Sequence, residues 1–176
     1  NHEESKKENY YIYAGRISKE KGVKELISSF NDAKLSNVKL KVVGTGPLLS
    51  SLKESNTNKA VEFLGPVTNE KVLNLIKNSK AVITATKLYE GQPTLLCEAS
   101  SFGIPSIFPE TGGISEFFPE KYSYKFKQFD YKDLEKKLTE ILHSNSHTSE
   151  GNSNKEFIMN MLSEEKLINK FREILN

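Results

Sequence analysis

Residues 90–98 read Glu90-Gly91-Gln92-Pro93-Thr94-Leu95-Leu96-Cys97-Glu98, and Glu98 is the only charged residue between Gly91 and Pro109. The stretch from Gly91 to Pro109 has the pattern of a turn, a buried helix and then a strand. A carboxylate left unpaired in such a packed segment costs several kcal/mol. Glu98 therefore needs a partner, and both a polar ligand and a lysine stay open as candidates.

The expected helix has a start that suits anion binding. Pro93 fits its first turn, where a missing N–H is no loss, and Gly103 fits the position just past its end. The backbone N–H groups of residues 94–96 would then be free and would point out of the helix toward Glu90. Helix starts of this kind attract phosphate and hydroxyl oxygens. For Glu90 itself, a solvated loop position remains the alternative.

Strand and helix alternate along the rest of the chain. Apolar runs that favour strands cover residues 10–14, 38–43, 60–64, 81–85, 105–108 and 122–126. Helices are expected between them at 23–33, 48–54 and 114–118, and also after caps at Thr68 or Asn69 and at Asp130. This alternation predicts an α/β fold of the Rossmann-like, doubly wound class, with a parallel sheet covered by helices on both faces.

The domain organisation is expected to be simple. Residues 1–143 predict one Rossmann-like domain, and 176 residues are enough to bury a proper core. Residues 144–154 are polar and predict a linker. Residues 155–176 carry apolar side chains at helical spacing and predict an amphipathic helical tail whose partner surface the sequence does not identify.

Composition excludes several function classes. The net charge is +2, with 25 basic and 23 acidic residues scattered along the chain, so we expect no nucleic-acid partner. Apolar runs are far shorter than the ~20 residues of a membrane span, and residues 1–9 lack a signal-peptide core, which favours a cytoplasmic protein. The single cysteine, Cys97, excludes an internal disulfide, and the three histidines lie in polar stretches, so no metal site is expected.

Ligands of doubly wound sheets bind beyond the carboxyl ends of the strands. Five loops that follow expected strands should therefore meet at one edge, and they begin at or near Arg16, Gly44, Gly65, Glu90 and Gly112.

The first of these loops carries two cations. Arg16 follows the strand-ending Gly15, Lys21 lies five positions later, and only two of the 25 basic residues of the chain are arginine. Together they could clamp a diphosphate, with Arg16 as a planar fork and Lys21 as a point charge. A solvated charged loop is the alternative.

The glycine-rich loops are less specific. The run Gly44-Thr45-Gly46-Pro47 indicates either a tight turn or a backbone that approaches a ligand, and the turn is favoured. The pair Gly112-Gly113 leaves the same two possibilities open. Cys97 is interpreted as a small core residue, because no histidine or aspartate lies near it in sequence.

Taken together, these segments resemble the C-terminal half of a retaining glycosyltransferase of the GT-B fold, glycosyltransferase family 4 (glycosyl transferases group 1). The pieces that carry the resemblance are YAGRISKEKGV (13–23), VVGTGP (42–47), FLGPV (63–67), YEGQPTLLCEAS (89–100) and GIPSIFPETGGISE (103–116). The similarity covers about residues 10–142. Glutamates eight positions apart, with Gly-Arg and Lys-Gly upstream, are its specific part.

The resemblance implies an enzyme that uses a nucleotide-diphosphate sugar as donor. Arg16 and Lys21 would hold the diphosphate as catalytic cations, and Glu98 would accept hydrogen bonds from both ribose hydroxyls. Glu90, also catalytic, would meet the donor sugar with the backbone of residues 91–94.

The remaining substrate contacts implied by the resemblance are backbone contacts. They come from Gly15 and Gly44, from Val67 toward the base, from Gly91, Gln92 and Pro93, and from the amides of Thr94 and Leu95. Many members carry a bulky apolar residue at the position of Gln92, so this departure leaves the identity of the sugar open.

The resemblance also implies hexosyl transfer to a glycan or lipid-linked acceptor in cell-surface polysaccharide synthesis, without a metal or other cofactor. An N-terminal acceptor-binding domain is expected in addition to this chain, and any membrane contact would come from the intact enzyme. The alternatives are a nucleotide-binding regulatory module and a GT-B phosphorylase or epimerase.

Overall fold

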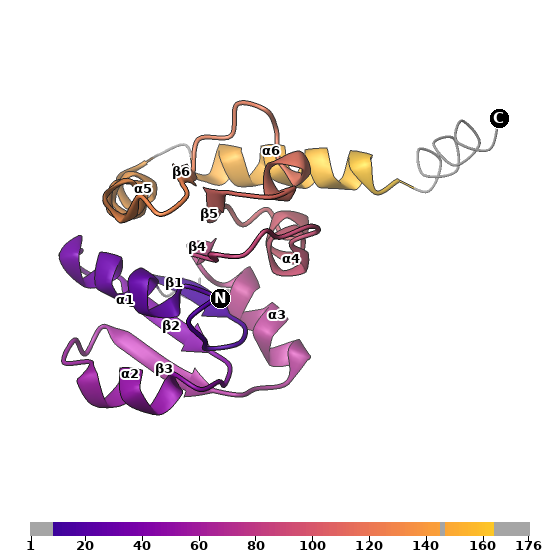
Figure 1. Ribbon diagram of the computed structural model, residues 1–176. Coiled ribbons are helices and arrows are strands. Elements are labelled where there is room, and N and C mark those ends of the chain that lie inside the picture. Colours follow the sequence, from indigo (N-terminus) through magenta and orange to yellow (C-terminus); the bar gives the residue numbers. More distant parts are fainter. Residues whose placement is uncertain (1–8, 145–146, 164–176) are drawn as a thin grey trace, which may run out of the picture.

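The computed structural model describes residues 9–144 and 147–163. Its core is one six-stranded sheet in the order β3-β2-β1-β4-β5-β6, and every strand pair is parallel (Figure 1). The strands are β1 (Tyr10–Ala14), β2 (Lys39–Val43), β3 (Val61–Gly65), β4 (Ala81–Ile83), β5 (Ser106–Glu110) and β6 (Lys125–Lys127). The predicted doubly wound parallel sheet is therefore confirmed.

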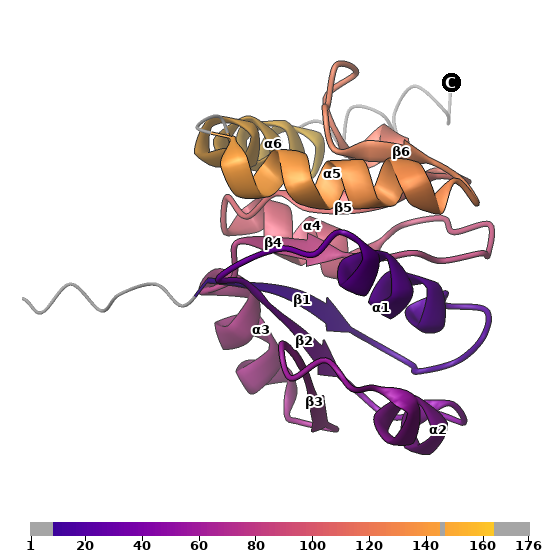
Figure 2. The same cartoon turned by 90° about the vertical axis from the view of Figure 1, so that its left-hand side faces the viewer.

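Helices cover both faces of this sheet. Figure 1 shows α1, α2 and α5 on one face and α3 and α4 on the other, and α6 runs alongside α4. The helices are α1 (Val23–Asp32), α2 (Leu49–Ser55), α3 (Asn69–Lys77), α4 (Thr94–Ser101), α5 (Tyr131–His143) and α6 (His147–Met161), with a 3₁₀ turn η1 (Ile114–Phe117). Figure 2 shows α5 lying across the top of the sheet above α1.

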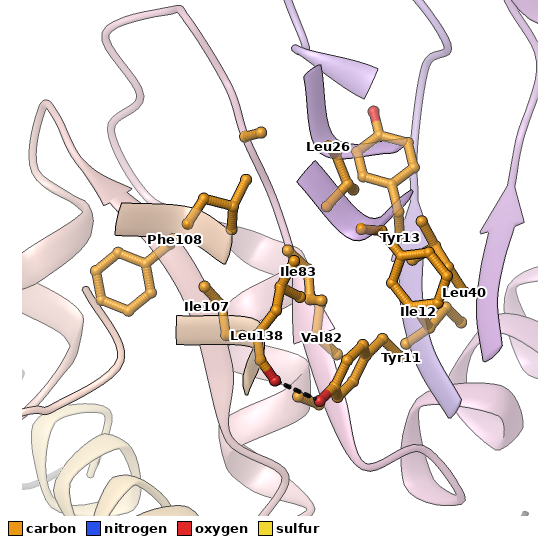
Figure 3. Packing of buried hydrophobic residues seen from close by; sticks show 14 of the residues in the cluster. Tyr11, Ile12, Tyr13, Leu26, Leu40, Val82, Ile83, Ile107, Phe108 and Leu138 are labelled. Atoms are coloured by element: carbon orange, nitrogen blue, oxygen red, sulfur yellow. Dashed lines mark hydrogen bonds between the residues drawn. The ribbon is translucent and has the colours of Figure 1, made fainter. Parts of the chain in front are cut away.

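The central strand β1 explains why its sequence is apolar on both sides. Its residues Tyr11 and Ile12 are fully buried, because helices pack on each face of the sheet. The hydroxyl of Tyr11 donates a hydrogen bond of 2.7 Å to the carbonyl of Leu138 in α5, as the dashed line in Figure 3 shows. A buried phenol needs such a partner, and this bond ties α5 to the sheet.

The N-terminal caps of two helices lie where the sequence predicts them. Thr68 caps α3 by accepting a hydrogen bond of 3.3 Å from the N–H of Lys71, and Asp130 caps α5 by accepting one of 3.1 Å from Asp133. The sixth strand is shorter than predicted and begins at Lys125. Tyr122 lies outside it because its ring stacks on Phe108 and its hydroxyl bonds the backbone of β5.

The predicted linker over residues 144–154 is wrong, because α6 begins at His147 and continues to Met161. Gly151 allows this helix to pack closely, since a Cβ there would overlap the carbonyl oxygen of Gly103. Asn154 and Ile158 are buried on the same side. Contact through a glycine gives no apolar signal in the sequence, which is why the segment resembles a linker. The part of the predicted tail beyond Ser163 lies outside the described residues.

Replacing Gly151 by alanine tests this packing, because the change in stability has opposite signs for a free helix and a packed one. In a linker or a free helix, alanine is neutral or stabilises by up to about 1 kcal/mol over glycine. Packed against Gly103, the added methyl group should instead destabilise the protein by about 1–3 kcal/mol. Urea denaturation monitored by circular dichroism measures the difference.

The matched control is Ser153→Ala, an exposed position of the same helix that should leave stability unchanged or slightly raised. Equal effects of the two substitutions would contradict the packing of α6 against the loop at Gly103.

Candidate functional site

The candidate site lies at the point of the sheet where the connecting helices change from one face to the other. β1 and β4 are neighbours in the sheet, but α1, which follows β1, and α4, which follows β4, cover opposite faces (Figure 1). The loops after the two strands therefore diverge and leave a crevice at the carboxyl edge. Crevices at such switch points are the usual ligand sites of doubly wound sheets.

Three adjoining pockets form one groove along this edge. The first, of about 250 Å³, lies in the crevice and is lined by Tyr13, Lys21, Thr86, Glu90 and the start of α4. The second, of about 390 Å³, extends over β2 and β3 to Val67, and it shares Ala14 and Gly15 with the first. A third, of about 300 Å³, lies between Arg16 and Lys21. The predicted loops thus converge in space.

Two other hollows lie outside this groove. One of about 680 Å³ lies between α1 and the start of α5, and another of about 570 Å³ lies beside Asn9 and Lys80, at the amino ends of β1 and β4. Both are larger, yet neither lies at the switch point. We therefore assign the candidate site to the groove.

Glycines let the loops of the groove approach one another. A Cβ at Gly44 would overlap the carbonyl of Gly15, and one at Gly22, whose φ is 65°, would overlap that of Ala85. The N–H of Ile17 donates to the carbonyl of Thr45 at 2.9 Å, so the first two loops are also hydrogen-bonded together. Gly44 therefore serves the tight turn that the sequence favours, and it lines the groove as well.

The first pocket contains an ion pair between two predicted site residues. The Nζ of Lys21 donates to Oε1 of Glu90 at 2.5 Å, and the hydroxyl of Thr86 donates to the same oxygen at 2.9 Å. The sequence analysis did not identify Thr86. Its only signal is a hydroxyl four positions before Glu90, just past the end of the fourth expected strand.

The pair Gly112-Gly113 holds the backbone of Glu90. The N–H of Gly113 donates to the Glu90 carbonyl at 2.8 Å. Gly112, at φ 57°, lies so close to the Glu90 backbone that a Cβ would overlap it. The sequence left open whether these glycines serve a tight turn or a close approach to a ligand. The contacts with Glu90 explain them by the packing of one loop against another.

The contacts of Glu90 keep it ionised. Burial raises the pKa of Glu90, but the hydrogen bonds from Lys21 and Thr86 outweigh this effect and place the pKa below its ordinary value. Burial and the nearby charge of Glu90 raise the pKa of Tyr13 in the same pocket. At neutral pH the site therefore holds an ionised Glu90 carboxylate and a neutral Tyr13 phenol.

Arg16 is the exposed cation of the groove. Its side chain makes no hydrogen bond or salt bridge within residues 9–144 and 147–163, and it borders the second and third pockets. The charge of Lys21 is partly balanced by Glu90, whereas Arg16 lies near the carboxylate of Glu20 and forms no ion pair with it among the described residues.

Glu98 lies on α4 and is half-buried rather than fully buried. Its carboxylate has no ion-pair partner among the described residues, so the lysine alternative receives no support. The expected cost of an unpaired buried charge is reduced here, because Glu98 itself stays partly exposed to solvent. Glu98 does not line the three pockets of the groove, and its contact with ribose stays a prediction.

The start of α4 offers fewer free N–H groups than predicted. Pro93 is the cap of the helix, and its carbonyl accepts from Leu96 at 2.9 Å, while the N–H of Thr94 donates to Gln92 at 3.1 Å. Within the described part of the chain, the Leu95 N–H alone of these three has no acceptor. The turn at residues 92–93 satisfies the other two. Gly103 follows the helix end with φ 71°, as predicted.

Most other predicted substrate residues line the groove. Gln92, Pro93, Thr94 and Leu95 border the first pocket on the side of α4, and Val67 borders the far end of the second. Gly91 is exposed and does not line any of these pockets.

Comparison with known proteins identifies the family. The family described as "Glycosyl transferases group 1" matches residues 1–161. This chain belongs to that family.

Two curated relatives are each 28% identical to the chain and are matched over 75% of it. They are the sulfoquinovosyl transferase SQD2 of Arabidopsis thaliana and the putative teichuronic acid biosynthesis glycosyltransferase TuaC of Bacillus subtilis. The group 1 chain spans 26% of the first relative and 32% of the second, so it matches only part of each.

Solved structures support the GT-B fold. A mutant of S. aureus TarM, in complex with UDP among other molecules, superposes with a TM-score of 0.82 at 21% identity, covering 97% of this chain and 36% of that one. Anabaena HepE with UDP-glucose gives 0.76 at 17% identity, over 96% of this chain and 48% of that one. The C-terminal domain of Francisella tularensis LpcC gives 0.73 at 17% identity, over 86% of this chain and 84% of that one.

The described residues show neither a metal-binding cluster nor a membrane-spanning helix. Within residues 9–144 and 147–163, three or more His, Cys, Asp or Glu side chains do not gather in a group able to hold a metal ion. Across the same residues, the helices are too short or too polar to cross a membrane.

Replacing Lys21 by methionine should raise the pKa of Glu90, because the variant removes a hydrogen bond and a positive charge from the carboxylate. A carboxylate with a lowered folded-state pKa stabilises the protein above its unfolded pKa, and this contribution is lost as the pH falls through the folded pKa. The variant should therefore lose about 0.5–1 kcal/mol of unfolding free energy at pH 7 and approach the unaltered chain only as the pH falls below about 4. Denaturation across this pH range and carbon-detected NMR titration of Glu90 measure both effects.

Lys24→Met is the matched control, because Lys24 is exposed on α1 and forms no salt bridge within the described residues. A pKa of Glu90 that is the same in both variants would contradict the ion pair.

Proposed function

We propose that this chain is the donor-binding domain of a retaining glycosyltransferase that uses a nucleotide-diphosphate sugar. The observation that carries the proposal is the groove at the β1–β4 switch point, with Arg16 and Lys21 bordering its middle and Glu90 in its innermost pocket. A nucleotide-diphosphate sugar has the same order of parts, with two phosphates between the nucleoside and the sugar.

The proposed placement of the donor follows from the chemistry of the groove. The base would occupy the second pocket near Val67, which Gly44 and Arg16 also line, and the ribose would lie between this pocket and Glu98 of α4. The diphosphate would lie between Arg16 and Lys21, and the sugar would enter the pocket of Glu90 and Thr94. Two matching structures of this fold contain UDP or UDP-glucose, which supports a nucleotide-diphosphate sugar as the ligand of the groove.

The chemical role of the site would be to stabilise the leaving group. When the bond between the sugar and the diphosphate breaks, negative charge develops on the phosphate oxygens. A preorganised guanidinium and ammonium can stabilise this charge more in the transition state than in the bound donor. The N–H of Leu95 at the start of α4, which has no acceptor among the described residues, would add a weaker contribution. We propose that no metal is needed for this role.

Transfer also requires an acceptor site. Holding the acceptor in position can contribute roughly 7–11 kcal/mol to lowering the barrier. Because the chain spans about a quarter to a third of its curated relatives, we propose that another part of the full-length protein supplies this site. A role in polysaccharide synthesis is supported by the names of two relatives, TuaC for teichuronic acid biosynthesis and AmsD of Erwinia amylovora for amylovoran biosynthesis. We propose a hexosyl donor and a glycan or lipid-linked acceptor in cell-surface polysaccharide synthesis.

Titration calorimetry of this chain with UDP, GDP and ADP tests donor binding directly. One nucleotide should bind preferentially, and Arg16→Ala should weaken that binding by about ten- to a hundredfold, since a charge-assisted hydrogen bond is worth roughly 1.5–3 kcal/mol. The matched control is Arg16→Lys, which keeps the charge but loses the planar fork and should show an intermediate loss. Failure of all three nucleotides to bind at about millimolar concentration would refute the proposal.

Glu98→Gln separates a ribose contact from a purely structural role. If Glu98 accepts hydrogen bonds from ribose, the substitution should lower nucleotide affinity by about ten- to a hundredfold and leave the melting temperature unchanged. The 2′,3′-dideoxy form of the bound nucleotide should show no such difference between the two proteins. A lowered melting temperature with unchanged affinity would assign Glu98 to the fold instead.

A further inference from the structure

Thr86 is a buried polar residue that the proposed chemistry does not yet use. It lies in the loop after β4, is 2% exposed, and lines the same pocket as Glu90. Its hydroxyl oxygen accepts a hydrogen bond of 3.2 Å from the N–H of Leu88 and donates one of 2.9 Å to Oε1 of Glu90. An ionised carboxylate can only accept, so the direction of the second bond is fixed.

The two oxygens of the Glu90 carboxylate have different surroundings. Oε1 accepts from both Lys21 and Thr86, whereas Oε2 has no hydrogen-bond partner among the described residues. The side chain of Glu90 is 26% exposed and borders the pocket. One oxygen is therefore held in place, and the other is available to a hydroxyl donor from a ligand.

The two groups that hold Oε1 differ in how firmly they are anchored. Lys21 is a flexible ammonium that an entering diphosphate would attract, because two phosphates carry more charge than one carboxylate. The Thr86 hydroxyl is tied to the backbone of Leu88, and the Glu90 backbone is clamped by Gly112 and Gly113. Thr86 would still hold Glu90 after Lys21 has moved to the donor.

We propose that Thr86 is a positioning residue that orients the Glu90 carboxylate, so that its Oε2 accepts a hydroxyl of the donor sugar. This inference rests on the proposed function, because it concerns the sugar end of the same donor. Thr86 makes no contact with the nucleotide in this arrangement and acts through Glu90. Its removal should therefore affect recognition of the sugar and leave recognition of the nucleoside diphosphate intact.

The test compares Thr86→Val, which keeps the shape and removes the hydroxyl, with Thr86→Ser, which keeps the hydroxyl. Calorimetry would measure the affinity for the preferred nucleoside diphosphate and for its glucose, galactose and N-acetylglucosamine conjugates. Thr86→Val should bind the nucleoside diphosphate as tightly as the unaltered chain does. Its affinity for the preferred sugar conjugate, relative to the nucleoside diphosphate, should fall by about three- to tenfold. Thr86→Ser should restore most of that loss, and Thr139→Val, an exposed threonine on α5, should change neither value.

A double-mutant cycle with Glu90→Gln tests whether Thr86 acts through Glu90. If it does, Thr86→Val should have little further effect on sugar affinity once Glu90 has been replaced. Additive losses would overturn the positioning role. Melting curves of each variant identify a loss of the fold, which would lower nucleotide and sugar binding together.

The outcomes separate the inference from the proposed function. Absence of nucleotide binding by the unaltered chain would refute both. If the unaltered chain binds a nucleotide and prefers one of its sugar conjugates, and Thr86→Val shows the same preference, the role of Thr86 is refuted and donor binding stands. Equal affinity of the unaltered chain for the nucleotide and all its conjugates would also refute the sugar contact.

Discussion

The parallel pairing of β1 with both β2 and β4 is the constraint on which the rest of the structure depends. Because β1 is flanked on both sides, the chain must wind away from it in two directions, and the helices must cover opposite faces of the sheet. The loops after β1 and β4 then separate and open a crevice. The residues of β1 from Tyr10 to Tyr13 are buried, so the crevice is built on the core of the fold.

Close backbone contacts turn this crevice into a chemical site. Glycines bring the loops after β1 and β2 together, and another glycine presses the loop after β5 against Glu90. The groove that results has an exposed guanidinium at its rim and an ammonium–carboxylate pair in its depth. An anion that enters at the Arg16 end meets this guanidinium beside the carboxylate of Glu20, and it then competes with Glu90 for Lys21. The charged groups that line the groove therefore differ between its Arg16 end and its Glu90 end.

Helices of the second half of the chain pack against the elements that line the site. Helix α6 packs on α4, and α4 provides the wall of the innermost pocket. The contact between Gly151 and the Gly103 carbonyl lies at the end of α4 remote from Pro93 and Thr94. The family match extends to residue 161, which includes α6, and agrees with its inclusion in the same folded unit.

The sequence by itself determined the order of strands and helices, the caps at Thr68 and Asp130, and the loops that carry the site. These features depend on periodicity and on hydrogen bonds between residues a few positions apart, which a local pattern records. The tertiary structure alone decided that Lys21 pairs with Glu90 across 69 positions, that Thr86 shares the same oxygen, that Glu98 is half-exposed, and that residues 147–154 form a packed helix. Each of these features depends on contacts between residues that are far apart in the sequence. A glycine contact or a buried hydroxyl does not change the periodic pattern of apolar residues, so the sequence pattern cannot reveal it.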